Sequence, residues 1–101
     1  MTQDELNAAL AAFAAAERLQ VEPEAAFVAW CGAAGASAVE RDGAWHLPPD
    51  PALGITDARI DVFDGRPRLS YVDRHVGIRL AFTITDAGRI AETTSADRWR
   101  G

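Results

Sequence analysis

The chain has 101 residues, of which 49% are hydrophobic and 25% are charged, and its net charge is −5 at neutral pH. This size predicts one domain, 1–101, and the composition excludes an intrinsically disordered chain. The N-terminus lacks the features of a signal peptide, and no apolar run is long enough to span a bilayer. The single cysteine cannot form an internal disulfide. Together, these features lead us to expect a cytoplasmic protein.

Charge is distributed unevenly along the chain. Residues 1–57 hold nine acidic residues against two arginines, whereas residues 58–101 hold six acidic residues and eight arginines. The acidic half disfavours direct binding to nucleic acid or to an anionic membrane, because both are negatively charged. It suits docking on a basic protein, although acidic residues also simply solvate helices. The absence of lysine and the 21 alanines are typical of a GC-rich, bacterial genome.

A first helix is expected over residues 4–20, which are strong helix formers. Thr2 followed three residues later by Glu5 matches a capping box. Three apolar residues recur at helical spacing and share one face: Leu6, Leu10 and Phe13. The remaining surface is rich in alanine, which allows close approach of another helix from this chain or from a second subunit.

A second helix is expected to begin near Pro23, because proline is favoured in the first turn of a helix. Gly32 and Gly35 are stop signals, so this helix should end between Cys31 and Ala34. Together the two helices form an expected helical layer, residues 1–35.

Beyond the helices, the apolar period changes from that of helices to that of strands, which predicts an antiparallel sheet over residues 37–94. Asp42-Gly43 and Asp64-Gly65 are favoured hairpin turns. The proline-rich segment 48–54 is expected to be a loop and 95–101 a polar tail. The expected strands are 38–41, 44–47, 58–64, 68–73, 76–85 and 89–94.

This order of elements predicts an α+β fold, with two N-terminal helices on one face of an antiparallel meander of four to six strands. Alternation in the strand 76–85 places its even-numbered residues on the buried face. The expected core is Leu6, Leu10, Phe13, Phe27, Trp30, Cys31, Val39, Ile60, Val62, Leu69, Tyr71, Ile78, Leu80, Phe82 and Ile84.

Trp30-Cys31-Gly32 resembles the start of a thioredoxin-type redox motif, but the context differs. A redox cysteine opens a helix, where the dipole stabilises its thiolate, whereas Cys31 should lie at a helix end. The second cysteine of such a pair is also missing, since position 34 is alanine. We therefore interpret Cys31 as a buried residue that anchors the helix.

Acid–base chemistry has one candidate group, in the segment Tyr71–Gly77. Asp73 and His75 are two residues apart and would share a strand face, where a carboxylate can orient an imidazole. A polar loop explains the same residues. His46 and His75 have no metal-ligand spacing, so we expect neither a metal nor another cofactor.

Candidate partner-binding residues fall into three groups. Arginines alternate along the expected solvent face of the sheet, where cross-strand ion pairs also explain them. The tail holds a tryptophan between arginines, residue types enriched at binding hot spots. Acidic helix residues complete the set, which is Arg59, Arg68, Arg79, Arg98, Trp99, Glu17 and Glu24.

Residues 62–92 resemble the closing strands of the NTF2-like, SnoaL-like superfamily. The resemblance rests on Phe82-Thr83-Ile84 followed by Asp86-Ala87-Gly88-Arg89-Ile90. It implies a curved sheet around an apolar pocket, frequent dimerisation, and ligand binding or cofactor-independent catalysis. In such a pocket enzyme the polar lining would be Tyr71, Asp73 and His75.

The sequence leads us to expect a noncatalytic binding or regulatory domain, a small acidic modulator or inhibitor docking on a larger protein such as a nucleic-acid enzyme. A homodimer, through the alanine surface or the sheet, is a further expectation. The alternative is a small-molecule-binding protein or enzyme with an NTF2-like apolar pocket.

Overall fold

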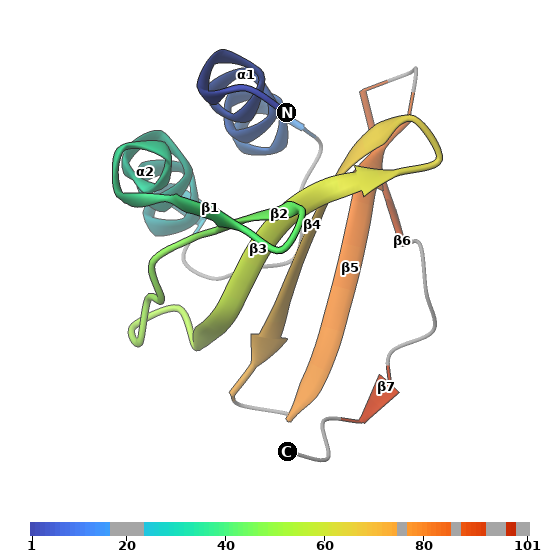
Figure 1. Ribbon diagram of the computed structural model, residues 1–101. Helices are drawn as coiled ribbons and strands as arrows, with labels where there is room; N and C mark the ends of the chain where they lie inside the picture. The colour runs from blue at the N-terminus through green and yellow to red at the C-terminus, as the bar shows by residue number, and fades with distance from the viewer. Residues whose placement is uncertain (17–23, 75–76, 86–87, 93–96, 99–101) are drawn as a thin grey trace.

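A computed structural model describes residues 1–16, 24–74, 77–85, 88–92 and 97–98. Two helices pack side by side on one face of an antiparallel sheet, as Figure 1 shows. The expected α+β architecture is therefore confirmed. No helix within the described ranges is both long and apolar enough to cross a membrane.

Helix α1 spans Gln3–Ala15 and begins at the expected capping box. The Thr2 side chain accepts a hydrogen bond from the Glu5 amide, and the Glu5 carboxylate accepts one from the Thr2 amide. The helix is shorter than the expected 4–20, because the backbone of Ala16 is already extended. Residues 17–20 lie outside the described part. Helix propensity alone is a weak predictor of where an alanine-rich helix ends.

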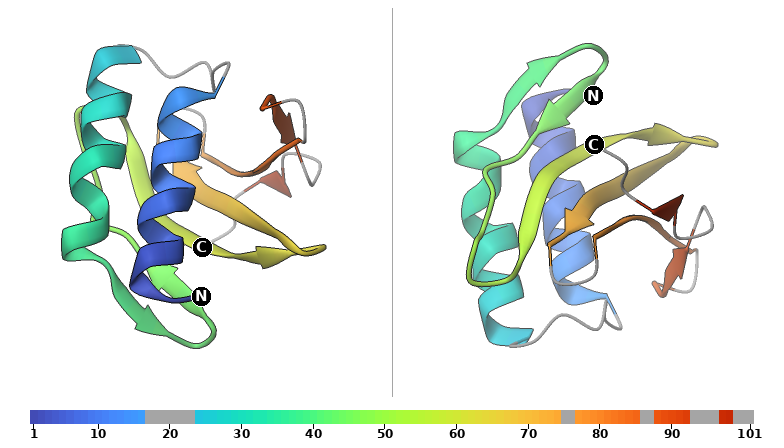
Figure 2. Two further views of the ribbon diagram at one scale, coloured as in Figure 1. Left: turned by 90° about the horizontal axis from the view of Figure 1, so that it is seen from above. Right: turned by 90° about the horizontal axis from the view of Figure 1, so that it is seen from below.

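Helix α2 spans Glu24–Ala34 and is followed by a 3₁₀ turn, η1, at Gly35–Ser37. Gly35 marks the end as expected, whereas Gly32 lies within the helix. A Cβ atom at position 35 would lie 2.3 Å from Asn7 Oδ1 of α1, so glycine permits the close approach of the two segments. Figure 2 shows α1 and α2 running antiparallel.

The sheet is a meander with strand order β1-β2-β3-β4-β5-β6, every neighbouring pair being antiparallel. Both expected Asp-Gly turns are present, and Asp42 and Asp64 have positive φ of 53°. The strands are Val39–Arg41, Ala44–His46, Ile55–Phe63, Arg66–Asp73, Ile78–Ile84 and Ile90–Glu92.

The largest differences from the expected sheet lie at the start of β3 and in the tail. β3 begins at Ile55 rather than at residue 58, and its register shifts between Thr56 and Arg59, where Asp57 has φ of 48°. This bulge interrupts the alternation that marks a strand. Within the expected polar tail, Asp97–Arg98 forms a two-residue strand, β7, paired with β5. Such a short polar strand has no apolar alternation by which to recognise it.

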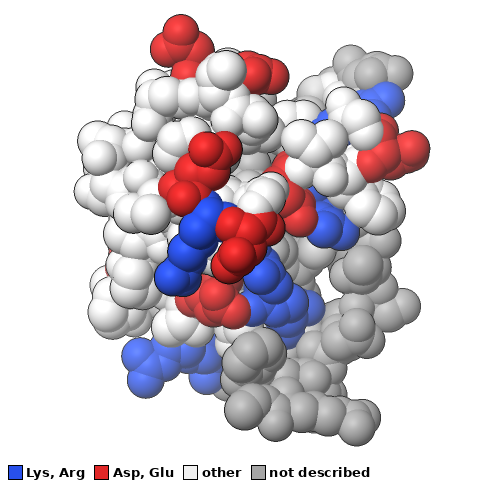
Figure 3. Space-filling view, viewed as in Figure 1, with Lys and Arg blue, Asp and Glu red and all other residues white. Residues whose placement is uncertain are grey.

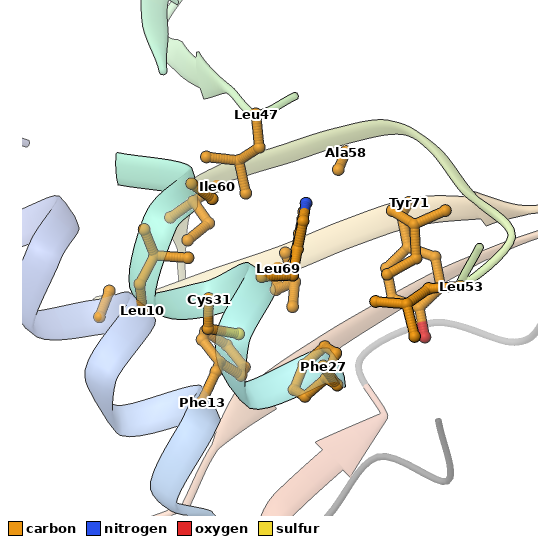
Figure 4. Packing of buried hydrophobic residues seen from close by; sticks show 14 of the residues in the cluster. Leu10, Phe13, Phe27, Cys31, Leu47, Leu53, Ala58, Ile60, Leu69 and Tyr71 are labelled. Atoms are coloured by element: carbon orange, nitrogen blue, oxygen red, sulfur yellow. The ribbon is translucent and has the colours of Figure 1, made fainter. Parts of the chain in front are cut away.

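The hydrophobic core lies between the helices and the sheet, with Cys31 beside Leu10 and Phe13 in the view of Figure 4. Two tryptophans tie the layers together. The Trp30 indole donates to the Pro48 carbonyl and the Trp45 indole to the Met1 carbonyl, both at 3.0 Å. The buried residues of this core are Leu6, Ala9, Leu10, Phe13, Phe27, Trp30, Cys31, Ala34, Leu47, Leu53, Ile55, Ala58, Ile60, Leu69 and Tyr71.

Two expected core residues are instead exposed, Val39 by 60% and Val62 by 58%. Val39 lies on the edge strand β1. Val62 lies near the end of the β3–β4 hairpin, which extends beyond α1 in both views of Figure 2. Both valines lie at positions where the alternating pattern of a strand predicts burial, but no neighbouring element covers them.

Strand β5 departs from the expected two-faced pattern. Leu80, Phe82 and Ile84 pack against the core but are only partly buried, and Ile78 is half-buried outside it. On the opposite face Ala81 and Thr83 are buried. The nearest cross-strand residues on that face include Arg68 opposite Thr83, and the aliphatic stem of an arginine can cover a small neighbour.

Candidate functional site

Cys31 is 2% exposed and lies in the last turn of α2. Burial raises the pKa of its thiol to about 12. The position near a helix C-terminus also disfavours a thiolate, because the carbonyl end of the helix dipole is negative. At neutral pH the sulfur is therefore a protonated thiol, and the interpretation as a buried anchor is confirmed.

Tyr71 and Asp73 lie on the same face of β4, two residues apart. Tyr71 is 3% exposed, and burial, with smaller contributions from Asp73 and Cys31, raises the pKa of its phenol to about 12. Asp73 is half-buried. His75, the third residue of this candidate group, lies outside the described residues.

Three predicted partner-binding arginines lie on the sheet face opposite the helices. Arg68 forms a bidentate ion pair with Asp61, at 2.9 Å from Nε and 2.7 Å from Nη2. This hydrogen bonding raises the pKa of Arg68, whose guanidinium carbon also lies 4.7 Å from the centre of the Phe63 ring. The predicted cross-strand pairing is thus confirmed for Arg68.

Arg79 forms an ion pair with Asp57, the residue that the bulge in β3 displaces from the regular register. Arg59 is half-buried and pairs in register with Ser70. Figure 3 shows acidic and basic side chains mixed in one band across the visible face. Two of these three arginines are therefore committed to internal ion pairs.

Of the other four predicted binding residues, the structure describes the backbone of two. Glu17 and Trp99 lie outside the described residues. Glu24 begins α2 and Arg98 lies in β7, but their side chains are not among those described. Within the described part of the chain, no group of three or more histidine, cysteine or acidic side chains could hold a metal ion.

A feature that the sequence did not reveal is a groove of about 800 Å³ along the solvent side of α1 and α2. Leu10 and Cys31, each 2% exposed, lie at its base. The other lining residues are Gln3, Asn7, Ala11, Ala14, Ala15, Val28, Gly32 and Ala36. The alanine-rich pattern indicated close helix approach, but a groove depends on how both helices are rotated about their axes.

A smaller hollow of about 350 Å³ lies between α1 and the β3–β4 hairpin. Its lining includes Val62, Glu5 and Arg66. Glu5 is engaged in the capping box, and Arg66 Nη1 donates to the Ile84 carbonyl at 3.0 Å. Tyr71 and Asp73 line neither this hollow nor the interhelical groove.

Comparison with known proteins adds no assignment: no family model, no curated protein and no solved structure matches this chain.

Proposed function

We propose that this protein is a noncatalytic binding domain, a small acidic modulator or inhibitor that docks on a larger and more basic protein. The interhelical groove carries this proposal. Its volume of about 800 Å³ is sufficient for part of another polypeptide. Among the described residues that line it, Cys31 is the one ionisable side chain, and its pKa of about 12 leaves it uncharged.

The charge of the helical layer supports the same proposal. Within α1 and α2 the charged residues are Asp4, Glu5 and Glu24, and neither helix contains a basic residue. The area of Figure 3 over these helices is mainly white, with acidic side chains at its upper edge. Such a surface attracts a basic partner and repels nucleic acid.

A capture experiment with immobilised protein tests this function. In a lysate of the organism that encodes it, we expect specific capture of a larger, basic protein at low salt and its release at high salt, because exposed charges are then screened. An unrelated acidic protein of similar size is the control. Capture of the same proteins by that control, or of none by the bait, contradicts the proposal.

The alternative function is small-molecule binding, or cofactor-independent catalysis, in an NTF2-like apolar pocket. The hollow of about 350 Å³ beside the β3–β4 hairpin favours this alternative, because its size is within the range of small-ligand sites. Its apolar residues would bind a ligand there. A failed capture experiment would make this the better account.

A further inference from the structure

We draw no further inference here: the strongest candidate, the groove on the solvent side of α1 and α2, is lined mainly by small side chains, and nothing in the described part of the chain shows what covers it.

Discussion

Cys31 shows how the surroundings of a residue decide its chemistry. Its neighbours in sequence, Trp30 and Gly32, resemble a redox motif, yet its side chain is 2% exposed and its thiol pKa is raised to about 12. The helix geometry predicted this outcome, because a cysteine near a helix C-terminus gains no stabilisation of its thiolate. The residue contributes packing between helix and sheet.

Replacement Cys31→Ser is expected to destabilise the protein by about 1–3 kcal/mol, because it places a hydroxyl group in the apolar core. Urea denaturation followed by circular dichroism measures the change in free energy of unfolding. Cys31→Ala is the control, since it removes the sulfur without adding a polar group. A serine variant as stable as the wild type would show that Cys31 is not buried in solution.

The arginines of the sheet illustrate a different residue-scale effect. Alternation predicted that Arg68 and Arg79 share the face opposite the helices, but their ion pairs with Asp61 and Asp57 depend on strand register. Asp61 lies directly opposite Arg68, whereas Asp57 is displaced by a bulge. Pairing of this kind reduces the value of these arginines as free binding groups.

The elements are predictable where local chemistry marks their ends. Thr2 and Glu5 start α1, and two Asp-Gly turns close the β1–β2 and β3–β4 hairpins. Both signals act through local hydrogen bonds and backbone conformation, so they need no knowledge of the rest of the fold.

The capping box gives a pH-dependent prediction. Hydrogen bonding to Thr2 lowers the pKa of Glu5 in the folded protein. A lowered folded pKa means that the contribution is present above the usual glutamate pKa and is lost as pH falls through the lower folded value. We expect Thr2→Ala to lower the free energy of unfolding by about 1 kcal/mol at pH 7.

At pH 3 the difference between wild type and Glu5→Ala should be smaller than at pH 7, as measured by thermal unfolding, because the Glu5 carboxylate that accepts from the Thr2 backbone N–H is then largely protonated. Glu5→Gln is the control, because it retains a hydrogen-bonding side chain but removes the titration. An equal effect of Glu5→Ala at both pH values would show that the Glu5 carboxylate does not contribute to the cap.

At the scale of the whole molecule, charge and shape are arranged in two layers. All charged residues of α1 and α2 are acidic. The described arginines are Arg41, in β1, and others that follow residue 57, in and around the sheet. The groove therefore lies on the acidic side of the molecule. This arrangement bears on self-association through the helical layer.

We expect a homodimer through the helical layer to be weaker at about 50 mM salt than at high salt, because the charged residues of α1 and α2 are acidic in both copies. Salt screens this repulsion, so any dimer through the groove should increase at high salt. Size-exclusion chromatography with light scattering at both salt concentrations measures this. A dimer that is strongest at low salt would instead indicate attraction between the acidic helices and the arginines of the sheet.

The parts of the core that could not be predicted share one cause. Val39 and Val62 have the strand pattern of buried residues, but their exposure depends on which element lies above them. Conversely Ala81 and Thr83 are buried on the face expected to be open. Alternation assigns a side chain to a face of the sheet, whereas burial depends on the coverage of that face.

The sequence by itself determined the α+β class, the capped start of α1, the hairpin turns and the buried role of Cys31, because short-range patterns specify each of them. Only the tertiary structure decided where β7 pairs, which valines are exposed, and that Val28, Gly32 and Asn7 line one groove. These features arise from contacts between segments distant in the chain, which depend on helix rotation and strand register.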